Sequence, residues 1–209
     1  KRNIVQNSLK NITVYPYAIS SKKRKVKIEK SISGGTGNLV ESIDGGGNTK
    51  TFQELLKEVK IDLAKIGLIK IDTDGYDWDC LNTISECLVK STLSVTPEFI
   101  FYEHQLFLNN KKIDEEDSTL RQKKYLDSIN NLKSLGYSRY YIFDNYGSLI
   151  IVTNEIDVLE QITFYPISSL LKNNLTTYYY CDVLITKEGN DHLVRSAIRQ
   201  TFSLKYKID

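Results

Sequence analysis

Apolar and polar residues follow one another along this chain with two different spacings, which predict strands and helices in turn. Four short apolar or alternating segments have the length and composition of strands: residues 12–19, 25–30, 68–71 and 99–102. In three other segments the apolar residues recur every three or four positions, which predicts amphipathic helices: residues 52–59, 80–88 and 118–135. Residues 31–50 carry two glycine clusters and are predicted to form a long loop.

The last third of the chain is predicted to be rich in strands and to close with a helix. The strand segments are residues 140–143, 149–152 and 178–185, and the helix covers residues 192–200. Helices placed between short apolar strands predict an α/β fold with a mostly parallel sheet covered on both faces. The strand-rich end predicts an antiparallel edge. The chain has 209 residues and no linker rich in Pro or Gly, so we expect one domain over residues 1–209.

The overall charge gives no support for a nucleic acid or an anionic membrane as a partner. Lys and Arg number 28 and Asp and Glu number 26, a formal net charge of +2. The basic run at residues 22–25 is predicted to be a solvated turn. No apolar stretch reaches the roughly 18 residues of a membrane span, and no secretory signal is visible, so we expect no membrane span and a cytoplasmic location. Cys80 and Cys87 have helical spacing and are predicted to be core thiols.

Two predicted strands end in an acidic residue. Asp72 follows the apolar segment 68–71, and Glu103 follows the segment 99–102. In open α/β sheets, ligands bind beyond the carboxyl ends of the strands. If the two strands are neighbours, Asp72 and Glu103 share one cleft.

The loop after residue 71 concentrates acidic side chains. Asp72, Asp74, Asp77 and Asp79 fall within eight positions, and Gly75 lies among them. Capping of the following helix accounts for Asp77 or Asp79. Asp72 and Asp74 precede the cap and require another explanation. They could hold a divalent cation, act as a general base, or accept a hydrogen bond from the polar end of a cofactor.

The acidic loop carries a resemblance to a known family. Residues 69–77 read Ile-Lys-Ile-Asp-Thr-Asp-Gly-Tyr-Asp, and a helix containing Leu81 follows. This segment resembles the signature of the FkbM family of S-adenosylmethionine-dependent methyltransferases, in which the next strand ends in Glu, here Glu103. Three further stretches are similar to the family in the same order, so that the resemblance covers roughly residues 4–185: residues 7–20, 143–147 and 179–182.

The resemblance implies the class I methyltransferase fold, a Rossmann-like sheet of seven strands whose last strand is antiparallel. Residues 14–18 would form the third strand of that sheet, residues 68–72 the fourth and residues 99–103 the fifth. The first two strands, the glycine-rich cofactor loop and the acidic residue that binds the ribose have no counterpart before Ile4. The Gly34–Gly37 cluster follows the third strand and lacks the context of a cofactor loop. We therefore expect the domain to be incomplete at its N-terminal side.

The resemblance also implies roles for particular residues. The cofactor would be S-adenosylmethionine, and the acceptor a sugar or glycan intermediate or another small molecule, with a divalent metal left open. The expected catalytic residues are Asp72, Asp74, Glu103 and His104, and a histidine that titrates near neutral pH suits a base. The expected cofactor-binding residues are Tyr17, Ala18 and Asp72, and the expected substrate-binding residues are Tyr76 and Asp77.

Two other functions fit parts of the sequence. A metal-dependent glycosyltransferase uses an Asp-x-Asp pair after an apolar strand, and Asp72-Thr-Asp74 has that pattern. A non-catalytic methyltransferase-like binding domain would fit the absent glycine loop and the tyrosine clusters at residues 140–141 and 178–180. The cofactor that binds would distinguish these classes.

Overall fold

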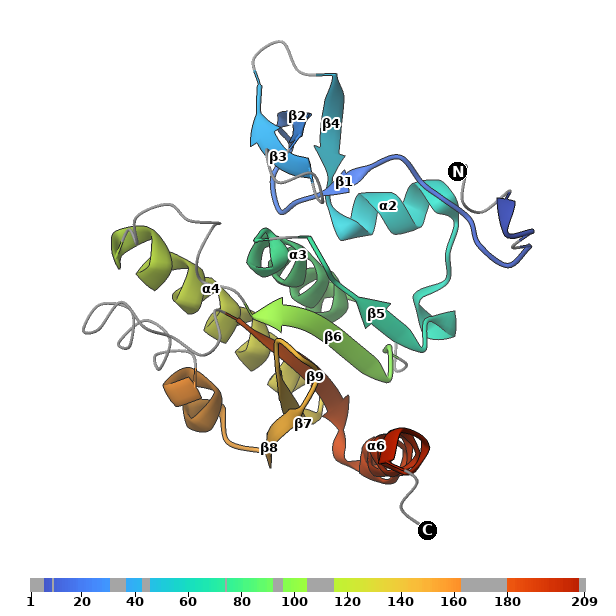
Figure 1. The fold of residues 1–209 in the computed structure, drawn as a ribbon. Coiled ribbons are helices and arrows are strands. Elements are labelled where there is room, and N and C mark those ends of the chain that lie inside the picture. The colour runs from blue at the N-terminus through green and yellow to red at the C-terminus, as the bar shows by residue number, and fades with distance from the viewer. Residues whose placement is uncertain are drawn as a thin grey trace. The chain divides into compact units, whose positions relative to one another are not determined.

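The chain divides into two compact units, Lys1–Thr51 and Phe52–Asp209. The structure is a computed structural model, and it describes residues 6–8, 10–30, 37–42, 46–73, 75–91, 96–104, 115–162 and 180–206. Each unit has its own sheet, and each is described by itself (Figure 1).

The first unit is built on a small mixed sheet. Its strands are β1 (Ala18–Ile19), β2 (Lys25–Lys30), β3 (Gly37–Glu41) and β4 (Gly47–Lys50), in the order β1-β4-β2-β3. The strand β1 runs parallel to β4, while β2 is antiparallel to both β3 and β4. The Thr49 hydroxyl is buried and bonds the backbone of the turn before β2, accepting from the Arg24 N–H at 2.9 Å. This side chain ties the end of the sheet to that turn.

Three predictions from the sequence concern this sheet, and their outcomes differ. The strand at residues 25–30 is confirmed as β2. The expected loop over residues 31–50 was wrong in part, because it contains β3, which pairs with the preceding strand β2, and β4, which pairs with the more distant β1 and β2. Gly34, Gly35 and Thr36 lie outside the described residues. The expected third strand of the main sheet, residues 14–18, was also wrong. Ala18 pairs with Thr49 of β4, and β1 belongs to the first unit's sheet.

The second unit contains a sheet of five strands. They are β5 (Leu68–Lys70), β6 (Phe99–His104), β7 (Tyr137–Asp144), β8 (Leu149–Thr153) and β9 (Cys181–Lys187), in the order β5-β6-β9-β7-β8. β5 and β6 are parallel. β9 lies antiparallel between β6 and β7, so β6 and β7 point the same way, and β7 forms an antiparallel hairpin with β8. The fold is thus α/β as expected, but its described strands make a mixed sheet.

Four helices accompany this sheet: α2 (Phe52–Val59), α3 (Asp77–Lys90), α4 (Glu115–Ser134) and α6 (Asp191–Tyr206). Short 3-10 helices lie at Leu63–Lys65 and Glu188–Asn190, and residues 156–162 are helical. These helices confirm the helical segments expected from apolar spacing. α4 ends just before Gly136, whose φ of +88° favours glycine and turns the chain into β7.

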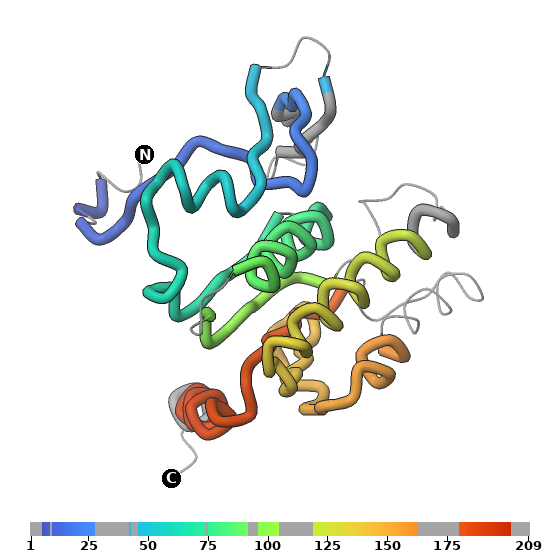
Figure 2. The backbone as a smooth tube through the Cα atoms, turned by 180° about the vertical axis from the view of Figure 1, so that it is seen from behind, coloured from blue at the N-terminus to red at the C-terminus, as the bar shows by residue number. Residues whose placement is uncertain are grey.

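The core lies between the sheet and the helices α3 and α4, which pack against each other and against β6 and β7 (Figure 2). Alternate residues of β6 point into it, so that Ile100, Tyr102 and His104 are buried. The matching face of α3 includes Leu81, Cys80 and Cys87, which are also buried. All three cysteines are free and buried, which confirms Cys80 and Cys87 as core thiols.

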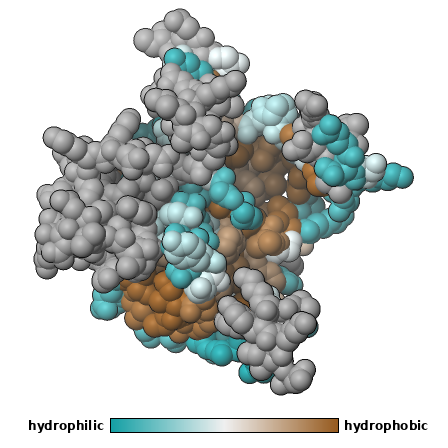
Figure 3. Space-filling model, in the orientation of Figure 1, coloured by the Kyte–Doolittle hydropathy of each residue, from teal (hydrophilic) through white to brown (hydrophobic). Residues whose placement is uncertain are grey.

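The opposite face of the sheet meets α6. Apolar side chains from Phe99, Leu184 and Phe143 face Val194 and Ile198 of α6 across a groove of about 500 Å³. Ile150 of β8 is 45% exposed. Figure 3 shows apolar side chains gathered on one face of the molecule. Within the described ranges, no helix has the length and apolar character needed to cross a membrane.

Candidate functional site

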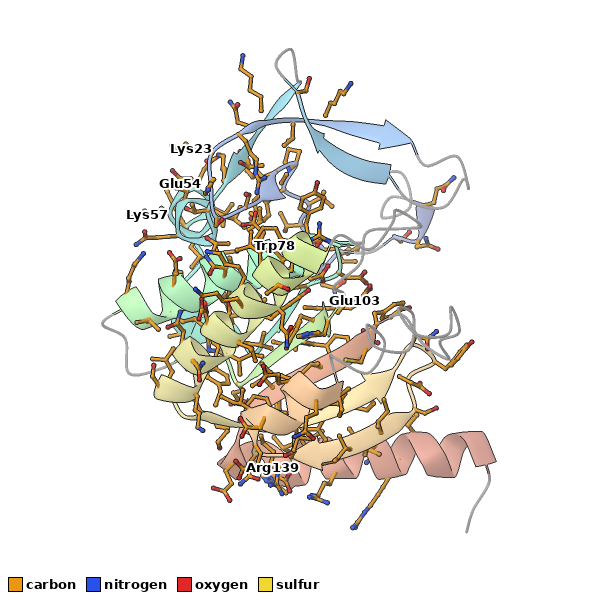
Figure 4. All side chains as sticks on the ribbon, turned by 90° about the vertical axis from the view of Figure 1, so that its left-hand side faces the viewer. Lys23, Glu54, Lys57, Trp78, Glu103 and Arg139 are labelled. Carbon is orange, nitrogen blue, oxygen red and sulfur yellow. The ribbon has the colours of Figure 1, made fainter. Side chains whose placement is uncertain are left out.

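Acidic side chains gather where the strands of the second unit's sheet end. β5 and β6 are parallel neighbours with Lys70 opposite Phe101, and the Ile71 N–H donates to the Phe101 carbonyl at 2.8 Å. Two positions further along from this pair, the chain reaches Asp72 after β5 and Glu103 in β6. The expectation that these two carboxylates end neighbouring strands is therefore confirmed. Figure 4 shows Glu103 at one end of the sheet and Arg139 at the other.

The antiparallel strands bring further carboxylates to the same end. Asp182 is the second residue of β9 and lies directly opposite Glu103, and Asp144 ends β7 opposite Cys181. The start of α3 adds Asp77. We refer to the five residues Asp72, Asp77, Glu103, Asp144 and Asp182 as the acidic edge.

The charges of the acidic edge act on one another. Burial raises the pKa of Asp182, and the neighbouring carboxylates of Asp72, Asp77 and Asp144 raise it further, while Lys70 opposes them. Each added negative charge makes ionisation of the next carboxyl harder. Asp182 is therefore a carboxylate that accepts a proton more readily than an isolated aspartate.

Asp72 is held by a lysine of its own strand. The Lys70 ammonium lies 2.6 Å from Asp72 Oδ2, and both side chains are 56% exposed. The hydrogen bond and charge of Asp72 raise the pKa of Lys70. An ion pair this exposed adds little stability. Its consequence is local, since it orients an accessible carboxylate at the carboxyl end of β5.

Asp77 is buried beneath the turn that follows β5. Its Oδ2 accepts hydrogen bonds from the Thr73 hydroxyl at 2.8 Å and from the backbone N–H groups of Thr73 and Gly75 at 3.3 and 3.4 Å. Gly75 has a φ of +109°, a conformation that suits glycine and brings its N–H toward this carboxylate. Burial raises the pKa of Asp77, and the hydrogen bonds from Thr73 and Gly75 partly offset this effect.

The buried position of Asp77 does not support the expected substrate contact. The residue is 0% exposed, and its Oδ1 makes no hydrogen bond of normal geometry with a described residue. Asp77 instead fixes the turn that carries Asp72. Tyr76 precedes α3 and is half-buried, which leaves part of its surface for a substrate. Asp74 lies outside the described residues.

His104 differs from the expectation of a base that titrates near neutral pH. It is buried on the helix side of β6 and stacks on Tyr125 of α4, with 4.1 Å between ring centroids. Its Nδ1 lies 3.4 Å from the Tyr102 hydroxyl. Burial lowers the pKa of His104 to about 3, so the ring is neutral and weakly basic at physiological pH. Its position favours a core role over proton transfer.

Tyr17 and Ala18 belong to the first unit. The Lys50 ammonium lies 3.7 Å from the centroid of the Tyr17 ring, a cation–π contact within that unit. Ala18 pairs with Thr49 in β1. Ala18 therefore belongs to a different sheet from the one whose strands lead to Asp72 and Glu103, and Tyr17 directly precedes it.

Two carboxylates of the acidic edge were missed as site residues. Asp144 and Asp182 lie in the stretches 143–147 and 179–182, whose similarity to the FkbM family was noted above. That similarity was the available signal. Their convergence with Glu103 required the strand order, because β9 inserts between two strands that precede it in the chain.

In the part of the chain that the structure describes, no three His, Cys, Asp or Glu side chains are arranged to hold a metal ion. No family model, curated protein or solved structure matches this chain. The candidate function therefore has to be argued from the acidic edge itself.

Proposed function

We propose that this protein is an S-adenosylmethionine-dependent O-methyltransferase that acts on a sugar or glycan intermediate. The observation that carries the proposal is the strand order β5-β6-β9-β7, in which the last strand enters antiparallel between two strands that point the same way. A final antiparallel strand is the feature that the FkbM resemblance implies for the end of the sheet. The matching acidic loop follows β5, where that resemblance requires it.

The charge of the acidic edge fits the proposed cofactor. S-adenosylmethionine carries a positive sulfonium and a positive ammonium, and clustered carboxylates favour cations through their combined field. The exposed Asp72 carboxylate, steadied by Lys70, is suited to hold the ammonium end. When bound, the cofactor supplies a methyl group on a positively charged sulfur.

The protein's own part in the reaction is to position the acceptor and take its proton. A sugar hydroxyl must lose a proton when its oxygen gains a methyl group. Asp182 is the better placed base, because its pKa is raised and it lies opposite Glu103 at the strand ends. Glu103 is the second candidate, and the half-buried Tyr76 ring offers a surface for the sugar.

A calorimetric titration with S-adenosylhomocysteine tests this proposal. We expect the unaltered protein to bind, and Asp72→Asn to weaken binding by about tenfold or more, since a hydrogen bond to a charged group contributes about 1.5–3 kcal/mol. The matched control is Asp127→Asn, which changes an exposed aspartate of α4. Control binding should match that of the unaltered protein.

Three results would count against the proposal. The protein could fail to bind S-adenosylhomocysteine, or Asp72→Asn and Asp127→Asn could bind equally well. Binding of uridine diphosphate only with Mn²⁺ would favour the glycosyltransferase alternative.

A further inference from the structure

The two units of the chain carry opposite charge, which the net value of +2 conceals. Lys1–Thr51 contains ten Lys and Arg residues against three Asp and Glu, a formal charge of +7. Phe52–Asp209 contains 18 basic and 23 acidic residues, a formal charge of −5. Such an asymmetry within one chain is typical of a segment that meets an anionic partner.

The lysines of the first unit reach the solvent. Lys22 and Lys23 lie in the turn between β1 and β2 and are exposed (Figure 4). Along β2, the exposed residues Lys25 and Lys27 alternate with Val26, which is 7% exposed. In the first half of this strand, the two lysines therefore lie on one face and Val26 lies on the other, buried face.

The same unit also exposes apolar side chains. The extended segment before β1 presents Ile12, Val14 and Tyr15, which are 46%, 44% and 41% exposed. This segment and the lysine turn flank β1 on its two sides in the sequence. Aliphatic side chains gain free energy by leaving water, so a partner that offers both an anionic surface and an apolar layer would match this unit.

We propose that the unit Lys1–Thr51 binds the surface of an anionic membrane, with its lysines against the lipid headgroups and Ile12, Val14 and Tyr15 at the level of the acyl chains. Peripheral membrane attachment combines these two contributions. A nucleic acid offers phosphates but no layer for exposed Ile12 and Val14. Lysine also predominates, with eight of the ten basic residues, whereas bidentate recognition of phosphates and base edges favours arginine.

Vesicle sedimentation tests this attachment, which is independent of the proposed methyltransferase activity. We expect the protein to sediment with phosphatidylcholine vesicles containing about a quarter phosphatidylglycerol, and at least about tenfold more weakly with pure phosphatidylcholine. Binding to the anionic vesicles should fall steeply in about 0.5 M salt, because the Debye length shortens.

Variants separate the two contributions. Replacing Lys22, Lys25 and Lys27 with Gln should weaken binding about tenfold or more, and Ile12→Ser with Val14→Ser should weaken it with the charge intact. The matched control replaces the exposed Lys57, Lys123 and Lys133 of the second unit with Gln, which removes the same charge. Circular dichroism checks that each variant folds.

Specific outcomes would overturn the proposal. Equal losses in the two triple variants would show that overall charge, rather than this unit, drives binding. Absence of binding to the anionic vesicles, together with tight binding of a fluorescent oligouridylate, would assign the basic unit to nucleic acid. If the protein binds neither the anionic vesicles nor the oligouridylate, the proposal is also rejected.

Discussion

At the scale of single residues, the carboxylates differ in role because their environments differ. Asp72 is exposed and paired with Lys70, Asp77 is buried beneath a turn, and Asp182 has a raised pKa at the strand ends. In the sequence, Asp72 and Asp77 are both aspartates of one motif, residues 69–77. Their different chemistry follows from burial, which a motif does not encode.

Replacement of Asp182 tests the assignment of the base. We expect Asp182→Asn to lower the rate of methyl transfer by about 10²–10⁴-fold, because the amide cannot accept the proton of the acceptor hydroxyl. S-adenosylhomocysteine affinity should change by less than about threefold in the same variant, since Asp72 is retained. A rate within a factor of about two of that of the unaltered protein would remove Asp182 from the proposed mechanism.

His104 contributes to the pH dependence of the free energy of unfolding, and this contribution can be measured. Burial lowers its pKa from 6.5 to about 3, so between these values the unfolded chain binds a proton that the folded chain does not. The contribution of His104 is therefore complete above pH 6.5 and decreases on acidification, by about 1.4 kcal/mol per pH unit, until pH approaches 3.

Urea unfolding of the unaltered protein and of His104→Phe, at pH 7 and pH 5, measures this contribution. Phenylalanine retains the stacking on Tyr125 and removes the titration. The variant should lose less stability between the two pH values than the unaltered protein. Equal losses would show that His104 is protonated in the folded state.

At the scale of elements, α6 is fixed to the sheet by its first residue. Asp191 accepts hydrogen bonds from Tyr141 and Arg139 of β7 and from Arg195 of α6. These donors, Tyr141 first, lower the pKa of Asp191 to about 2. The attachment is therefore intact above pH 3.8 and is lost as pH falls through about 2.

Asp191→Ala should loosen this helix selectively. The change removes the carboxylate acceptor of the buried Tyr141 and leaves it only the Asp191 backbone carbonyl at 3.4 Å. A hydrogen bond to a charged group contributes about 1.5–3 kcal/mol. We expect amide hydrogen exchange in residues 191–201 to accelerate by about tenfold or more. The exposed Asp157→Ala serves as control. If α6 exchanges at the same rate in both variants, the Asp191 contacts do not hold the helix.

The elements themselves were largely predictable, and their partners were not. Apolar spacing located α2, α3, α4 and α6, because a helix with one buried face repeats locally in the sequence. The pairing of β1 with β4 and the insertion of β9 between β6 and β7 depend on contacts between distant segments. Local patterns therefore indicated the strands of the second unit and β2, but they missed β3 and β4 and could not assign β1 to a separate sheet.

At the scale of the whole molecule, the chain consists of two units of opposite formal charge. The basic unit Lys1–Thr51 is suited to an anionic surface, and the acidic edge of Phe52–Asp209 is suited to a cationic cofactor. The net charge of the whole chain gave no support for an anionic partner, because the formal charges of the two units, +7 and −5, nearly cancel. The division between the units became visible only with the structure.

The acidic edge as the cofactor site is the central claim, and a crystal structure of the protein with bound S-adenosylhomocysteine tests it most directly. The account predicts ligand density at the carboxyl ends of β5 and β6, with the Asp72 carboxylate within hydrogen-bond distance of the ligand's amine. Density elsewhere, for example in the apolar groove beneath α6, or a ligand that leaves Asp72 and Glu103 in water, would contradict it.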